Sequence, residues 1–323
     1  MRLFTLVAAW KLRRAIRDNR YDLVVSFTNS DPLWRQDRNW FSNALKCLKK
    51  LVRNPGALGF YLLPWMLSGS KVPLAVYDWD DNTIIARKNW GLLNRATCYF
   101  KTQSPRNPYK AFLFQDKRND CIFNIVKQPV YHEWIKKLRP ISVGVSLPPN
   151  WSDLQTTEKK TDVFFAGAVH YSWARIEGIR QLEELREEGF KIDLELNSPT
   201  TANFLEFLRR CSEAWLVWSP EGAGWDCMRH YWAPMTGSVP LLNHPDTRRH
   251  LPLIDGIHAF YYGVEDADLK RVVKLALSDK TRLRQMAAQG EAFTRPRHLH
   301  PALANYLIAE TLKTAAACPR SPI

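Results

Sequence analysis

Five short apolar runs alternate with helical patterns in the second half of the chain, and this alternation constrains the fold more than any other feature. The runs have the length and the β-branched and aromatic content of strands. They cover residues 162–166, 192–196, 214–218, 238–242 and 259–262. Helices are expected at 176–188, 201–211, 227–235, 247–252, 267–277 and 281–293. Strands and helices that alternate at this spacing predict a parallel sheet covered on both faces.

The first half is less regular. A helical pattern over residues 3–16 precedes the first strand-like run at 21–26, and further runs follow at 73–78, 97–101 and 141–145. A Rossmann-like half normally begins with a strand, so we expect this half either to lack its first strand or to begin downstream of it. The proline-rich stretch 147–151 predicts a boundary that separates domains 1–150 and 151–323.

The positive charge of the chain is concentrated in the first half. Residues 1–150 hold 25 Lys/Arg against 10 Asp/Glu, whereas residues 151–323 hold 21 against 22. Such a field attracts an anionic partner, which leaves an acidic glycan, a phospholipid surface and nucleic acid as alternatives. The basic amphipathic stretch 40–52 and the apolar stretch 57–67 could rest on a membrane, although packing of the helix on the sheet explains the same pattern.

The cysteine pattern and the hydropathy of the sequence indicate where in the cell the protein is located. The six cysteines are single, with no spacing typical of zinc ligands. No run reaches the roughly 20 apolar residues that span a bilayer, and the first residues lack the order of a signal peptide. We therefore expect a cytoplasmic protein, with peripheral contact at the inner face of the membrane left open.

The segment from Ser219 to Pro240 carries the most specific motif. It follows a buried strand with the glycine-rich turn Glu-Gly-Ala-Gly-Trp-Asp, and a helical pattern comes next. Glycines allow a ligand to approach the backbone, and the helix directs unpaired N–H groups and its positive dipole end at the turn. Arg229 falls on the first turns of that helix, where a guanidinium can bind phosphate oxygens. The segment predicts a diphosphate site, and an ordinary strand-to-helix turn is the alternative.

This segment resembles the donor-site signature of GT-B glycosyltransferases, in particular the exostosin-like and family-1-like branches. The positions that match are Glu221, Gly222, Gly224, Asp226, Arg229 and Pro240. The family usually has a glutamate for the donor ribose five residues before the turn glycine, Gly237 here, and this chain has Trp232 instead. The resemblance covers about residues 162–293. It implies an α/β fold of two Rossmann-like domains, whose final helix, 301–314 after a break at 295–297, crosses back onto the first domain.

The resemblance also implies a set of donor-binding residues. The loop after the first C-terminal strand faces the donor phosphates in this family, and the end of the next strand contacts the base. The candidates are Gly167, His170, Asn197, Glu221, Gly222, Gly224, Trp225, Asp226, Arg229 and Trp232. For Trp225 and Trp232, packing is the simpler interpretation.

Catalytic candidates follow from the same resemblance. Arg229 and Arg175 would stabilise the departing nucleoside diphosphate, so no metal and no other cofactor is expected. Asp31, Asp78 and Asp80 are candidate bases. The alternatives are a turn residue before Pro32 for Asp31 and a solvated acidic turn for residues 78–82, a cluster that could also ligate Mg²⁺.

The predicted function is transfer of a sugar, as in a hexosyltransferase, from a nucleotide-diphosphate sugar to an acidic glycan or a lipid-linked acceptor, as in polysaccharide or lipopolysaccharide biosynthesis. A non-catalytic homologue that binds nucleotide or sugar is one alternative, suggested by Trp232. A nucleic-acid-binding protein is a second, suggested by the basic half, although no nucleic-acid partner is expected because no known module is present. An epimerase on the same fold is a third.

Overall fold

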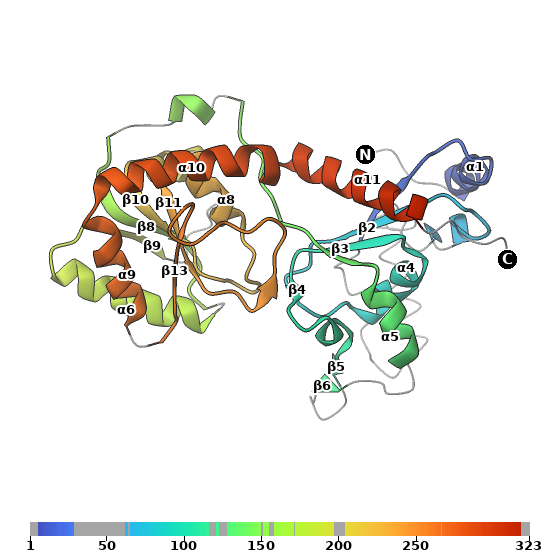
Figure 1. Ribbon diagram of the computed structural model, residues 1–323, viewed down its shortest axis with the longest axis horizontal. Coiled ribbons are helices and arrows are strands. Elements are labelled where there is room, and N and C mark those ends of the chain that lie inside the picture. Colours follow the sequence, from blue (N-terminus) through green and yellow to red (C-terminus); the bar gives the residue numbers. More distant parts are fainter. Residues whose placement is uncertain are drawn as a thin grey trace.

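The computed structural model describes residues 6–28, 62–63, 65–115, 121–122, 128–149, 151–154, 158–170, 172–196, 204–265 and 267–317. Two α/β domains lie next to each other, and the last two helices run from one to the other (Figure 1). None of the described helices is both long enough and apolar enough to cross a membrane.

The N-terminal domain is built on a parallel sheet of order β1-β2-β3-β7. Its strands are β1 (Val24–Phe27), β2 (Leu74–Asp78), β3 (Cys98–Lys101) and β7 (Leu138–Pro140). The α-helices are α1 (Leu6–Arg17), α4 (Trp90–Arg95) and α5 (Gln128–Ile135). Shorter elements are η1 (Arg87–Asn89), β4 (Ser104–Pro105), η2 (Pro108–Phe112), β5 (Phe114–Gln115) and β6 (Cys121–Ile122). A core of Leu, Ile, Trp and Tyr side chains fills one side of the sheet.

The C-terminal domain has a parallel sheet of order β13-β11-β10-β8-β9. Its strands are β8 (Thr161–Gly167), β9 (Ile192–Leu196), β10 (Ala214–Trp218), β11 (Val239–Asn243) and β13 (Phe260–Tyr262). Its helices are η4 (Trp151–Leu154), α6 (Trp173–Glu187), α7 (Phe204–Glu213), α8 (Met228–Met235), α9 (Asp268–Leu277) and α10 (Lys280–His298). Side chains of α6, α9 and α10 fill one face, and those of α7 and α8 fill the other. The expected sheet with two covered faces is confirmed.

Among the described residues, the contacts between the domains include a strand pairing and the packing of the last helix. β12 (Thr247–Arg248) pairs antiparallel with β4 of the N-terminal domain. α11 (His300–Ala317) packs Leu303 and Leu307 against Ala75, Cys98 and Phe100 of the N-terminal sheet. In Figure 1, α10 crosses the top of the C-terminal domain and α11 continues over the N-terminal domain.

Three sequence-based predictions of elements are wrong. The helix expected at 247–252 is absent, because Thr247 and Arg248 pair with β4 instead. The strand expected at 141–145 lies earlier, at β7, and the chain leaves the sheet after Pro140, with Gly144 at a φ of +67°. The break expected at 295–297 comes later, because α10 continues through Pro296 to His298.

Candidate functional site

The order in which the chain adds strands to the C-terminal sheet reverses between β8 and β10. The chain runs from β8 outward to β9 and then crosses back over β8 to β10, which places α6 and α7 on opposite faces. In open α/β sheets a ligand binds outside the carboxyl ends of the strands at such a switch point. The loops that follow β8 and β10 therefore border the expected ligand crevice.

Arg229, in the first turn of α8, lies at this switch point and is 6% exposed. Its Cζ is 4.7 Å from the centroid of the Phe165 ring. An ideal Cβ on Gly167 would lie 3.1 Å from Arg229 Nη2. Nη1 is buried and has no hydrogen-bond partner among the residues that the structure describes. A buried cation without an anion is costly, so the arrangement favours an anionic ligand.

The amino end of α8 adds to this preference. The cap residue Cys227 makes no side-chain hydrogen bond to the helix. The first N–H groups of a helix have no partner within the helix, and the dipole places partial positive charge there. Arg229 and the start of α8 therefore offer positive charge and N–H donors next to each other, which suits an anion.

Arg175 joins the two loops of the crevice to each other. Its Nε donates to the Glu221 carbonyl at 2.8 Å, and its Nη1 donates to the Ala168 carbonyl at 2.6 Å. Its Cζ is 5.9 Å from the same Phe165 ring that Arg229 covers. Ser172 caps α6 and also donates to the Glu221 carbonyl at 3.1 Å. Arg175 thus positions the loops, and its predicted contact with phosphate stays a prediction.

The glycines of the motif form a tight turn. Gly222 N–H donates to the Gly224 carbonyl at 2.9 Å. An ideal Cβ on Gly222 would lie 2.7 Å from Arg175 Nη2, and one on Gly224 would lie 2.7 Å from the Asp81 carbonyl of the N-terminal domain. A Cβ at position 224 would therefore collide with backbone of the other domain, whereas one at position 222 would require the Arg175 guanidinium to shift. The sequence motif alone does not reveal either contact.

Gln103 of the N-terminal domain holds the next two residues of the loop. Its Oε1 accepts from the N–H groups of Trp225 at 3.0 Å and Asp226 at 3.1 Å, and its Nε2 donates to the Asp226 carbonyl at 3.1 Å. The side chain is 1% exposed. Sequence reasoning missed Gln103, because its partners lie more than a hundred residues away and no local pattern marks it.

Two members of the predicted donor set have their side chains engaged within the protein. Asp226 accepts from Val143 N–H at 2.6 Å and from the Tyr231 hydroxyl at 2.6 Å, and burial raises its pKa to about 6. Trp225 is 4% exposed and donates from Nε1 to the Asn243 carbonyl at 2.9 Å. Both side chains have structural roles here.

The remaining predicted donor residues differ in position. Glu221 is half-buried and accepts from Asn243 Nδ2 at 3.1 Å, and burial raises the pKa of its carboxyl. Trp232 packs against Phe204 and Phe207 with ring centroids 5.0 and 5.5 Å away, in keeping with the packing interpretation. His170 is exposed in the loop after β8. Asn197 lies outside the described residues.

His230 supports the loop between β10 and α8. Its Nε2 lies 2.8 Å from the Trp225 carbonyl, which can only accept, so Nε2 carries the proton and Nδ1 accepts from the Ser219 hydroxyl at 2.7 Å. Burial lowers the pKa of His230 to about 3. The histidine is therefore neutral and structural.

Asp78, a base candidate predicted from the sequence, is buried and accepts several hydrogen bonds within the protein, which argues against that role. It accepts from Tyr99 Oη at 2.8 Å and from Lys101 Nζ at 3.3 Å, and also from Thr28 Oγ1 at 3.2 Å. Both Asp78 and Lys101 are 1% exposed. The buried pair lies at the carboxyl ends of β2 and β3.

The other acidic residues of this turn are more accessible. Asp80 accepts from Asn82 N–H at 3.0 Å. The Asp81 carbonyl faces Gly224, and burial raises the pKa of the Asp81 carboxyl. Asp31 lies outside the described residues. Within the described part of the chain, no group of three or more His, Cys, Asp or Glu side chains could hold a metal ion.

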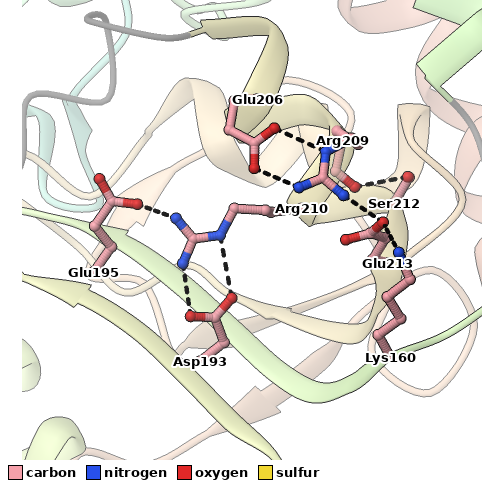
Figure 2. Close-up of polar contacts among 8 residues, drawn as sticks. All are labelled: Lys160, Asp193, Glu195, Glu206, Arg209, Arg210, Ser212 and Glu213. Atoms are coloured by element: carbon pink, nitrogen blue, oxygen red, sulfur yellow. Dashed lines mark hydrogen bonds and ion pairs between the residues drawn. The ribbon is translucent and has the colours of Figure 1, made fainter.

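A second arginine, Arg210 of α7, stacks on Phe164, the neighbour of Phe165 in β8. Its Cζ is 4.6 Å from the Phe164 ring centroid. Figure 2 shows its guanidinium between Asp193 and Glu195 of β9. The two bonds to Asp193 measure 2.6 and 3.2 Å. The adjacent Arg209 pairs with Glu206 and Glu213 in the same figure.

Several solved structures align with this chain. A UDP-forming α,α-trehalose-phosphate synthase from Burkholderia xenovorans aligns with 95% of this chain and 86% of its own, at 13% identity and a TM-score of 0.51. A glycosyltransferase from Rickettsia africae aligns with 99% of this chain and 84% of its own, at 9% identity and a TM-score of 0.49. The Anabaena protein HepE, solved with UDP-glucose, aligns with 95% and 82%, at 10% identity and a TM-score of 0.47.

The chain thus has the fold of GT-B glycosyltransferases, with two Rossmann-like domains. No family model matches the sequence, and no curated protein sequence matches it.

Proposed function

We propose that the chain is a glycosyltransferase, of the hexosyltransferase kind, that binds a nucleotide-diphosphate sugar at the switch point between β8 and β10. The observation that carries this proposal is Arg229, which is buried over Phe165 with its Nη1 unpaired among the described residues. A diphosphate matches the guanidinium in charge and in geometry, because two phosphate oxygens can accept from it together. The first N–H groups of α8, which no side chain caps, would bind the same diphosphate.

In the proposed reaction the bond between the anomeric carbon and the β-phosphate oxygen breaks. The acceptor oxygen forms the new bond to that carbon, and its proton passes to a base or to water. Arg229 and the start of α8 would stabilise the negative charge that develops on the diphosphate. Arg175 and Gln103 would act as positioning residues, since they hold the loops that border the crevice.

The acceptor is proposed to lie on the side of the N-terminal domain. The acidic turn 78–82 of that domain contacts the loop between β10 and α8, because the Asp81 carbonyl faces Gly224. Asp80 remains a candidate base, as does Asp31 outside the described residues. The positive charge of the first half would attract an acidic glycan or a lipid-linked acceptor. We also propose that the boundary of the two domains lies between residues 150 and 151, and that the protein is cytoplasmic.

A non-catalytic binder is the second candidate, and one observation favours it. Trp232 takes the position where related enzymes carry a ribose-binding glutamate, and here it is packed against Phe204 and Phe207. Such a protein would retain the diphosphate site and lack turnover.

Calorimetry with UDP, GDP, ADP, CMP and their sugars tests the binding step. UDP comes first, because the similar Burkholderia enzyme is described as UDP-forming. We expect one of the nucleoside diphosphates to bind. When acceptors are added, the matching nucleotide sugar should be consumed and that nucleoside diphosphate released. Binding without release in any acceptor mixture would favour the non-catalytic candidate. A folded protein that binds none of these compounds would overturn both.

A further inference from the structure

The helix α1 presents basic and apolar side chains to solvent on one face. Its opposite face is held in the core by Ala9 and Ile16, which are 1% and 0% exposed. The exposed residues recur at the helical spacing of one stripe: Val7, Trp10, Lys11, Arg14 and Arg17. Val7 is 63% exposed and Trp10 is 56% exposed. Large apolar side chains on a basic stripe are typical of a helix that lies at an interface.

Neighbouring residues extend this surface. Trp65 is 44% exposed, and Arg13 Cζ lies 4.3 Å from its ring centroid. A hollow beside the helix is lined by Trp10, Arg14, Arg20 and Tyr21 among others. Two carboxylates lie in this region: Asp18, which is 3.9 Å from Arg14 and 3.7 Å from Arg20, and Asp22, which follows Tyr21. This part of the surface keeps a net positive charge, because its two carboxylates are outnumbered by Lys11, Arg13, Arg14, Arg17 and Arg20.

The helix α1 lies far from the loops after β8 and β10. In Figure 1, α1 lies at the outer end of the N-terminal domain, on the side away from the C-terminal domain. A flat surface that contacts α1 can therefore do so without covering the loops after β8 and β10.

We infer that the exposed face of α1, together with Trp65 and Tyr21, docks on an anionic phospholipid surface. Its arginines and lysine match lipid phosphates in charge, and the hollow between Arg14 and Arg20 fits a headgroup. Val7 favours a bilayer over nucleic acid, because acyl chains cover an aliphatic side chain whereas a polyanionic backbone does not. Tryptophan and tyrosine commonly occupy the level of the headgroups. The inference does not depend on the proposed transferase activity.

Sedimentation of the full chain with vesicles tests the inference. Vesicles of phosphatidylcholine with a third of phosphatidylglycerol should bind the protein, and vesicles of phosphatidylcholine alone should bind it at least about tenfold more weakly. Added salt should weaken binding to the anionic vesicles. Val7→Ser with Trp10→Ser should reduce the partition coefficient about tenfold or more, from loss of buried apolar area.

Matched variants separate this effect from misfolding. Leu275→Ser alters a side chain of α9 that is 54% exposed, and it should leave partition unchanged. Arg14→Glu with Arg17→Glu should reduce partition by at least about tenfold, whereas Arg14→Lys with Arg17→Lys should retain most of it. Unchanged partition in the Val7/Trp10 variant would overturn the assignment to α1. Tight binding of duplex DNA by a protein that ignores anionic vesicles would overturn the lipid partner.

Discussion

Two arginines cover consecutive phenylalanines of β8, and their surroundings are opposite. Arg210 stacks on Phe164 with Asp193 and Glu195 on either side of its guanidinium (Figure 2). Arg229 stacks on Phe165, and its Nη1 has no partner among the described residues. The first arrangement is complete without a ligand, whereas the second needs an anion from outside the described structure. On our proposal, the comparison separates an arginine that stabilises the fold from one that binds a ligand.

The largest expected effect follows from removing the unpaired arginine. Arg229→Met should weaken binding of the nucleoside diphosphate about a hundredfold, because a charge-assisted bidentate contact is worth up to about 3 kcal/mol. The free energy of unfolding without ligand should not fall, because the variant removes a buried charge that has no counter-ion among the described residues. Calorimetry and urea unfolding measure the two effects. A variant that binds normally but unfolds easily would reverse the proposed roles of the two arginines.

The paired arginine should give the opposite result. Arg210→Met leaves Asp193 and Glu195 without their shared cation, and their side chains are 31% and 39% exposed. We expect a loss of about 2 kcal/mol in the free energy of unfolding, less than for a fully buried pair. Nucleotide affinity should change by less than about twofold, within the noise that distant substitutions produce. A large loss of affinity would show that Arg210 also serves the ligand.

Gln103 tests whether the N-terminal domain positions the loop before Arg229. Gln103→Ala leaves the N–H groups of Trp225 and Asp226 without their acceptor, which should cost about 1–2 kcal/mol of stability and weaken diphosphate binding about fivefold. Gln181→Ala is the matched control, because Gln181 is 1% exposed and bonds Lys270 N–H on a distant helix. That control should lower stability alone. Equal affinities in both variants would exclude a positioning role for Gln103.

The neutral His230 makes this loop sensitive to acid. Burial lowers its pKa to about 3 from an ordinary value of 6.5, so the unfolded chain binds one more proton than the folded chain between these values. Stability should therefore fall as the pH drops below about 6.5, by about 1.4 kcal/mol per pH unit from this group. Urea unfolding of wild type and His230→Gln between about pH 7 and about pH 5 measures the difference in slope. Parallel slopes would contradict a neutral His230.

The smallest effect on diphosphate affinity is expected from a substitution of Gly167. A Cβ there would lie 3.1 Å from Arg229 Nη2 and 3.2 Å from the Phe165 ring, so the guanidinium must move by a few tenths of an ångström. Gly167→Ala should weaken diphosphate binding about threefold and change stability by less than about 1 kcal/mol. Gly91→Ala in α4, where nothing lies within 4 Å of the added carbon, should leave affinity unchanged. The outcome that would contradict this contact is an affinity as high as that of wild type.

The strands of the C-terminal domain were predictable because each is a local apolar run. β9 and β10 fall at the expected residues, and β8 differs by one residue at each end. The segment 247–252 was not predictable, because its pairing partner, β4, lies more than a hundred residues earlier. The continuation of α10 through Pro296 likewise depends on packing, since local rules favour a break there.

Some features of the candidate site could likewise be predicted from local sequence, and others could not. The position of Arg229 after a glycine turn could be inferred from spacing, because a strand, a turn and a helix place it locally. The burial of Asp78 with Lys101, the bonds of Arg175 to two carbonyls and the contact of Gln103 with the loop all depend on tertiary structure. A pattern of residue types identifies such groups as candidates, and only their partners decide what they do.

The most direct test compares UDP with UMP, or the corresponding pair for the base that the calorimetric screen selects. Both compounds are titrated into wild type, Arg229→Met and Arg210→Met. If Arg229 binds the diphosphate, the affinity gained from the second phosphate should shrink by about 2 kcal/mol in Arg229→Met and remain intact in Arg210→Met. If the second phosphate contributes equally in all three proteins, Arg229 does not contact it, and the account of the site is wrong.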